Sequence, residues 1–278
     1  MIEILTDSTS DLNTPLMEQY GLRFIPLQVI IGEAAYKDLV EIDVPRLFQS
    51  VEELGILPKT SAPSVADFTA FFDASPAEDL IFIGIGSKLS ATYQSAVLAA
   101  ETSRKNVHVI DSANLSTGIG TLVLNACEMK NQGSSAGEIV SRIEAEKDKV
   151  RCYFVIDTMD YLYKGGRCTA MQALVGSILK IRPVIEVRPD GTLGVKDKVS
   201  GSRKKAQQRL LEMIKKDREQ LDLRRAFITH TCSQEEAESV KAELLKIAPF
   251  EAVHITNAGA VIASHCGPDT LGLIYALK

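Results

Sequence analysis

Hydroxyl side chains gather at four places in the first half of the chain, each after an apolar segment or at the start of a helical pattern. These places are residues 6–12, 59–68, 86–93 and 111–120. In the third, Ser90 stands where an apolar strand pattern gives way to a helix. A helix start presents unpaired N–H groups and partial positive charge, which suit it to bind an anion. Ser90 could equally be a plain helix cap, so this segment alone leaves both interpretations open.

The elements that position these hydroxyls follow an alternating pattern. Through about residue 148, short apolar strands alternate with amphipathic helices, which predicts a mostly parallel sheet covered on both faces. The carboxyl ends of parallel strands share one edge, where ligands sit. We therefore expect the four hydroxyl segments to form the polar rim of one pocket. Residues 23–43 have an alternating pattern with glycine and could form a small hairpin beside this sheet.

The second half has a different order of elements. From residue 149, strands are followed by strands as often as by helices, and Asp190-Gly191 is a hairpin turn signal. This pattern predicts an open mixed sheet with helices on one face. We expect an α/β protein of two domains: residues 1–148, with the Ser/Thr-rich turns, and residues 149–278, an α+β domain.

Two segments of the second half are unusual. His265 precedes Cys266-Gly267-Pro268, which predicts a turn that orients His265, followed by a short closing helix. Residues 251–265 read as a strand region. A polar turn at residues 164–167 precedes a helix, over residues 170–181, that is apolar on nearly every side. Such a helix is either buried core or the lining of an apolar tunnel, and the pattern does not decide between them.

Composition excludes several classes of protein. The net charge of −5 argues against a nucleic-acid partner. We see no secretion signal and no apolar run long enough to span a bilayer. The cysteines are odd in number and scattered, which fits reduced thiols in the cytoplasm and no metal site. They are Cys127, Cys152, Cys168, Cys232 and Cys266.

Familiar catalytic and nucleotide motifs are not supported. The string GIGSKL lacks the third glycine of a dinucleotide fingerprint, and no phosphate loop of the Gly-x-x-x-x-Gly-Lys-Ser/Thr type occurs. Residues 133–137 match the nucleophile-elbow string but join two helices instead of a strand and a helix. Ser135 stands three residues before Glu138, the spacing of a capping box. We therefore interpret that serine as structural.

Several motifs together resemble one family along the full length of the chain. TDSTSDL, KTSAPS, SKLSATYQSA, DSANLSTG, YLYKGGR, RKKA and SHCGPDTLG occur in the order seen in the DegV family. The resemblance implies two α/β domains that bind a long-chain fatty acid between them, with no cofactor. Similar proteins are the bacterial FakB subunits, which present the bound acid to a separate ATP-dependent fatty acid kinase catalytic subunit. The acyl phosphate then enters phospholipid synthesis, so transient contact with a membrane surface is also open.

The resemblance also assigns roles to individual residues around the carboxylate. It places the carboxylate at Ser90, next to Ala91, with Thr60 and Ser61 facing it and His265 near the head group. The family more often has glycine where this chain has Ala91, so the approach of the backbone there is altered.

Further residues are assigned to a partner surface and to the acyl tail. By the resemblance, Arg167 and Arg203 mark the surface that engages the kinase or closes over the head group. The stretch around Arg203 departs from the commoner arginine-rich version, as YLYKGGRC departs from YLKKGGRI. The apolar helix would line the acyl tail with Met171, Leu174 and Ile178, and each methylene taken out of water adds roughly 0.8 kcal/mol.

Two other functions stay open. The first is a serine acyl hydrolase or transferase with Ser90 as nucleophile and His265 as base, although no third residue can be named to orient the histidine. The second is a small-anion-binding protein that uses the same crevice without a tunnel for a tail.

Overall fold

The computed structural model describes residues 1–168 and 181–278. The helix predicted over residues 170–181, with its tail-lining residues Met171, Leu174 and Ile178, lies outside the described residues except for Ile181, which begins a strand.

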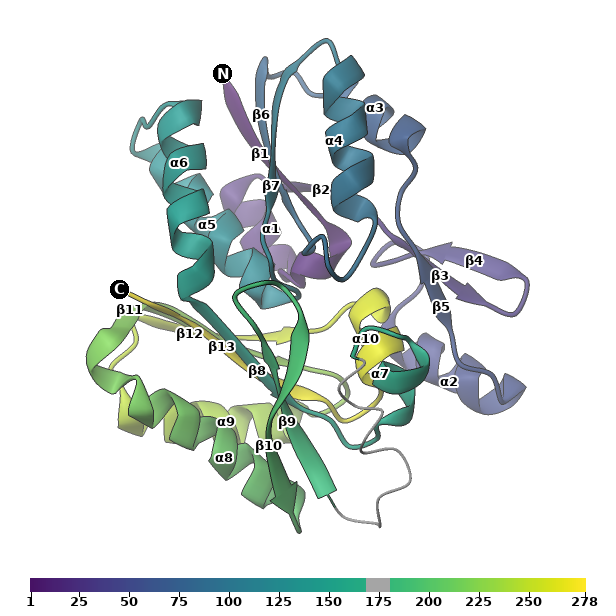
Figure 1. Ribbon diagram of the computed structural model, residues 1–278, viewed down its shortest axis with the longest axis vertical. Helices are drawn as coiled ribbons and strands as arrows, with labels where there is room; N and C mark the ends of the chain where they lie inside the picture. The colour runs from purple at the N-terminus through teal and green to yellow at the C-terminus, as the bar shows by residue number, and fades with distance from the viewer. Residues whose placement is uncertain (169–180) are drawn as a thin grey trace.

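The first half is built on a four-stranded parallel sheet in the order β2-β1-β6-β7. Helices cover both faces (Figure 1). Side chains of Leu80 and Phe82 pack under α3 and α4, whereas Ile81 and Ile83 pack against α1, α5 and α6. The bounds are β1 Ile2–Asp7, β2 Arg23–Ile25, β6 Asp79–Gly84, β7 Asn106–Asp111, α1 Thr14–Tyr20, α3 Val65–Asp73, α4 Thr92–Thr102, α5 Thr117–Asn131 and α6 Ala136–Glu146.

A small antiparallel sheet in the order β4-β3-β5 lies beside the parallel sheet. It contains β3 Gln28–Ile31, β4 Ala34–Lys37 and β5 Lys59–Ser61, and α2, Val44–Leu54, connects the last two strands. The hairpin predicted within residues 23–43 is therefore present as β3 and β4.

The second half forms a six-stranded mixed sheet in the order β10-β9-β8-β13-β11-β12, in which only β11 and β12 are parallel neighbours. The predicted hairpin at Asp190-Gly191 joins β9 to β10. Helices α8 and α9 cover the face opposite α5 (Figure 1). The bounds are β8 Val150–Val155, β9 Ile181–Val187, β10 Leu193–Ser200, β11 Leu221–His230, β12 Ala252–Asn257, β13 Leu271–Leu277, α7 Asp160–Lys164, α8 Arg203–Lys216, α9 Gln234–Ile247 and α10 Ala260–Cys266.

Helix α5 lies between the two large sheets. Its residues 117–127 are all buried, and one continuous core contains Ile83 of the parallel sheet together with Phe154 and Ile274 of the mixed sheet. The layers therefore run from α3 and α4, through the parallel sheet, to α5 and α6, and on through the mixed sheet to α8 and α9 (Figure 1). The predicted fold class is confirmed, while the domain boundary at residue 148 stays a prediction.

The C-terminal elements correct two predictions. The strand that was predicted to continue to residue 265 ends at Asn257, the last residue of β12. Gly259 is then the N-cap of the short helix α10. The predicted closing helix is wrong, because residues 271–277 form β13, which pairs with β8 and β11 in the middle of the sheet. Their continuous apolar pattern suits a strand that is buried on both faces. Within the two described ranges, no helix is both long and apolar enough to cross a membrane.

Candidate functional site

One pocket brings together four of the residues that the sequence singled out: Thr60, Ser90, Arg167 and His265. They belong to four separate parts of the fold: Thr60 to β5, Ser90 to the turn before α4, Arg167 to the turn after α7 and His265 to the last turn of α10. The other described residues that line the pocket are apolar or carry a thiol: Leu27, Ile85, Leu89, Leu115, Leu162, Leu193, Val261, Ile262 and Cys266. The site thus has a small polar end on an otherwise apolar wall.

The polar end contains a histidine that is held neutral. Nε2 of His265 lies 2.8 Å from Oγ1 of Thr60. Burial, and then the nearby Arg167 cation, lower the pKa of His265 from 6.5 to about 4. Its Nδ1 is buried and has no hydrogen-bond partner among the described residues. At neutral pH the ring therefore carries one N–H only.

The position of that proton decides what Thr60 offers a ligand. If Nε2 of His265 carries the proton, it donates to the Thr60 oxygen, and the Thr60 hydroxyl is then free to donate its own proton into the pocket. An anion in the pocket favours this tautomer. In the other tautomer the Thr60 hydroxyl donates its proton to Nε2 of His265 and has none left to donate to the anion. His265 and Thr60 together thus form a hydrogen-bond donor suited to an anion.

Ser90 lies just before the helix start rather than at its cap. Helix α4 begins at Thr92, and Ala91 occupies the N-cap position without a side-chain cap bond. The Ser90 Oγ accepts a 3.3 Å hydrogen bond from the Thr92 backbone N–H and lies 2.8 Å from the Thr92 Oγ1. When the Thr92 hydroxyl also donates to it, the Ser90 hydroxyl donates elsewhere, and the pocket is where its ligand would be.

Arg167 supplies the positive charge. Its Nε donates to the Leu89 carbonyl at 3.3 Å, and a second nitrogen donates to the Gly165 carbonyl. Among the described residues that line the pocket, none is acidic. One cation and two hydroxyls without a neutralising carboxylate favour an anionic ligand.

The apolar wall continues into the protein interior. A second, inner cavity shares Leu115, Ile262 and Cys266 with the pocket. Ile262 and Cys266 are four residues apart and so lie on one face of α10. The inner cavity reaches the mixed sheet at Phe154 and Gly272, among other residues. The sequence analysis missed this lining, although the apolar spacing in residues 258–266 signals a buried helix face.

Two buried aspartates hold the helix that carries His265. Asp11 Oδ1 accepts from the Gly259 N–H at 2.8 Å, and Asp38 Oδ1 accepts from the Ala260 N–H at 2.7 Å. Burial is the main cause that raises the pKa of Asp38 to about 6 and the pKa of Asp11 well above its usual value. Both carboxyls therefore satisfy N–H groups at the start of α10, which has no side-chain cap of its own.

Two of the four hydroxyl segments do not form the rim that we expected. In residues 6–12 the polar side chains are buried, and Asp7, for example, accepts hydrogen bonds from the backbone N–H groups of Thr9 and Ile85. In residues 111–120, the Ser116 hydroxyl donates to Asp11 at 2.5 Å and the Thr117 hydroxyl contacts Thr229, so that only Leu115 reaches the pocket. Helix α5 begins at Thr117 and packs between the two large sheets, so the hydroxyls at its start serve the core. Segments 59–68 and 86–93 supply the hydroxyls of the pocket.

Three other assigned residues do not line the pocket. Ser61 follows Thr60 in β5, and neighbouring residues of a strand point to opposite faces, so Ser61 points away from the pocket. Its hydroxyl donates to the Ala62 carbonyl at 3.2 Å. Ala91 is exposed at the start of α4. Arg203 is bound by Glu236 and lies 3.8 Å from both Asp157 and Asp269. The proposed roles of these residues stay predictions.

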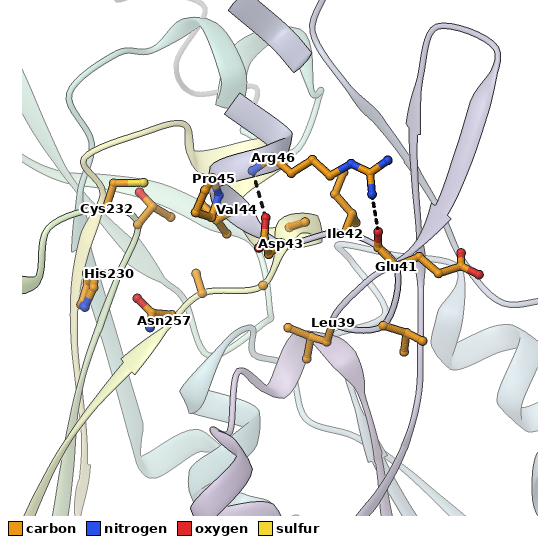
Figure 2. A pocket seen from close by; sticks show the side chains of 15 residues that line it. Leu39, Glu41, Ile42, Asp43, Val44, Pro45, Arg46, His230, Cys232 and Asn257 are labelled. Carbon is orange, nitrogen blue, oxygen red and sulfur yellow. Dashed lines mark hydrogen bonds between the residues drawn. The ribbon is translucent and has the colours of Figure 1, made fainter. Parts of the chain in front are cut away.

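A larger cleft, of about 530 Å³, contains none of the assigned residues. It lies between residues 39–46 and the carboxyl ends of β11 and β12 (Figure 2). Several of its polar groups are already paired: Asp43 accepts from the Arg46 N–H, the Arg46 guanidinium donates to the Glu41 carbonyl, and His230 bonds Gln234. We therefore place the candidate site in the smaller pocket. In the described part of the chain, no three His, Cys, Asp or Glu side chains gather where they could hold a metal ion.

The chain belongs to the DegV family: the family described as "Uncharacterised protein, DegV family" matches residues 1–278. A DegV domain-containing protein of Caldanaerobacter subterraneus subsp. tengcongensis is 35% identical over 280 residues, which cover 100% of this chain and 99% of the relative. A solved structure described as fatty acid binding of a DegV family protein from Thermus thermophilus has a TM-score of 0.91 and 33% identity, with 99% of each chain covered. The Streptococcus pneumoniae fatty acid kinase B3 protein, loaded with linoleic acid, shares the fold over 100% of each chain at 23% identity and a TM-score of 0.88.

Proposed function

We propose that this protein binds one long-chain fatty acid, with its carboxylate between Thr60 and Ser90 beside Arg167. The observation that carries the proposal is the composition of the pocket wall: one cation, two hydroxyls and a histidine at one end, while the other described residues of the wall are apolar or carry a thiol. The inner cavity, which shares three residues with this wall, would take the tail. Each buried methylene adds roughly 0.8 kcal/mol, so the tail supplies most of the affinity and the polar end selects an acid.

The similarity to the Thermus thermophilus protein supports this ligand class, because that relative binds fatty acid and is 33% identical over nearly the whole chain. The test is denaturing extraction of the purified protein, beside native mass spectrometry of the same sample. We expect about one long-chain fatty acid per chain, since a buried apolar tail leaves slowly. Only traces of lipid, with no uptake of added palmitate or oleate, would refute the proposal.

We further propose that the bound acid is presented to a separate ATP-dependent fatty acid kinase, and that this chain is itself not catalytic. Arg167 is exposed and contacts the polar end of the pocket, so a partner could reach the carboxylate there. The fold shared with the Streptococcus pneumoniae protein agrees with this role. The protein alone should neither hydrolyse acyl esters nor consume ATP, and acyl phosphate should form only with a kinase. With five cysteines, an odd number scattered along the chain, the protein would work in the cytoplasm.

The two alternative functions are less well supported. A serine hydrolase needs His265 as the base for Ser90, but the His265 Nε2 bonds Thr60 instead. The His265 Nδ1 also has no orienting partner among the described residues. A small-anion-binding protein would need no apolar inner cavity behind its polar end.

A further inference from the structure

The floor of the inner cavity is formed by the six-stranded sheet. On the sheet face turned toward α5, Phe154 of β8, Gly272 of β13 and Thr229 of β11 form one row across neighbouring strands. All three line the inner cavity. On one side of the row Phe154 has a large side chain, and on the other side the Thr229 hydroxyl contacts the Thr117 hydroxyl. Gly272, in the middle of the row, has no side chain.

The backbone does not require glycine at this position. Gly272 lies inside β13, in regular register with both neighbouring strands, and is not among the residues with positive φ. A Cβ built there would meet Ile274 Cδ1 at 3.3 Å, Thr229 O at 3.5 Å and Phe154 Cβ at 3.6 Å. The closest of these atoms is the end of a flexible side chain. The methyl group of an alanine could therefore be accommodated with a small shift of Ile274.

Glycine inside a central strand weakens the sheet and often marks a place where a ligand approaches closely. Here the strand has no bulge at the glycine, and the hollow it leaves opens into a cavity that adjoins the anion pocket. We propose that Gly272 sets the depth of the acyl cavity and so determines the longest acyl chain that the protein binds well. This inference rests on the proposed function, because it assumes that the cavity holds the tail of a bound acid.

The experiment compares the wild type with Gly272→Ala and Gly272→Val in their affinity for saturated acids from dodecanoic to eicosanoic acid. Each methylene that a filled floor excludes should weaken binding roughly fourfold. We expect Gly272→Ala to shift the preferred chain toward shorter acids by about one methylene, and Gly272→Val by about two to three. Affinity for the shortest acid should stay within about twofold of the wild type, because its tail does not reach the floor.

Ala276→Val is the matched control, because Ala276 lies four residues further along β13, on the same face, and does not line the cavity. It should leave the chain-length preference unchanged. Thermal unfolding of each apo variant shows that it folds, and Gly272→Ala is small enough to keep the comparison if the valine variant unfolds. Folded glycine variants with the wild-type chain-length preference would overturn the inference while the proposed function stood. If the wild type bound none of the acids, the proposed function would fail first.

Discussion

Ser90→Ala tests whether the Ser90 hydroxyl serves a ligand or only the helix start. In the apo protein the substitution removes the acceptor of the Thr92 N–H, at 3.3 Å, and the partner of the buried Thr92 hydroxyl. Loss of such a cap-like contact costs about 1 kcal/mol of folding stability. That cost is present with or without ligand, so it does not enter the binding free energy.

The binding term is separate and depends on charge. A hydrogen bond to a charged group is worth about 1.5 to 3 kcal/mol, so palmitate should bind Ser90→Ala about 10- to 150-fold more weakly than the wild type. Hexadecanol, which has the same tail but no charge, should lose less than about fivefold. The assay is displacement of a fluorescent fatty acid by each ligand, beside urea unfolding of the apo protein.

Ser87→Ala is the control for Ser90→Ala, because Ser87 is an exposed serine of the same turn that does not line the pocket. It should change neither the affinity for palmitate nor that for hexadecanol. Equal losses for the acid and the alcohol in Ser90→Ala would refute the reasoning, since the hydroxyl would then act only on the helix.

Two further predictions concern His265 and Arg167. The folded-state pKa of His265, about 4 against the usual 6.5, means that its contribution to stability is complete above pH 6.5 and is lost as the pH falls through about 4. His265→Gln should therefore flatten the fall in the free energy of unfolding over that window by up to about 3 kcal/mol, measured by urea unfolding. Asp38, with its pKa raised to about 6, changes the free energy of unfolding with pH in the opposite direction. Its effect is the same in the wild type and in His265→Gln, so it cancels in the comparison. An unchanged dependence of the free energy of unfolding on pH in His265→Gln would contradict the buried neutral histidine. Arg167→Ala should impair acyl phosphate formation with a kinase more than it lowers bound lipid; lost lipid with normal turnover of the remaining loaded protein would instead make Arg167 a retention residue.

The alternation of strands and helices predicted the parallel sheet, and the Asp190-Gly191 signal predicted the hairpin of the second sheet. Both are local patterns, set by turn chemistry and hydrophobic period. The prediction of a closing helix was wrong because the short apolar run of residues 271–277 suits a buried strand as well as a helix. Pairing with β8 and β11 makes it a strand. The pairing with β8 joins residues more than a hundred positions apart, and neither pairing leaves a local signal.

At the site, the hydroxyls of Thr60 and Ser90 followed from segments that lie after an apolar run or at a helix start and from the family resemblance, and the structure brings both to one pocket. Residues 6–12 show the same composition, yet their side chains are buried. A sequence does not distinguish a hydroxyl that faces a cavity from one that satisfies a buried carboxyl, such as Ser116 beside Asp11. The contact between Thr60 and His265 joins residues 205 positions apart and is a property of the tertiary structure alone.

The position of α5 limits how a ligand can enter. Residues 117–127 are buried against both large sheets, so separating the two halves of the molecule would expose one face of α5 and the facing side of the mixed sheet to water. The cost of exposing that much apolar surface far exceeds thermal energy. We therefore do not expect the two halves to separate as rigid bodies when an acid binds or leaves. We expect exchange through local movement at the polar end, where Arg167 is exposed.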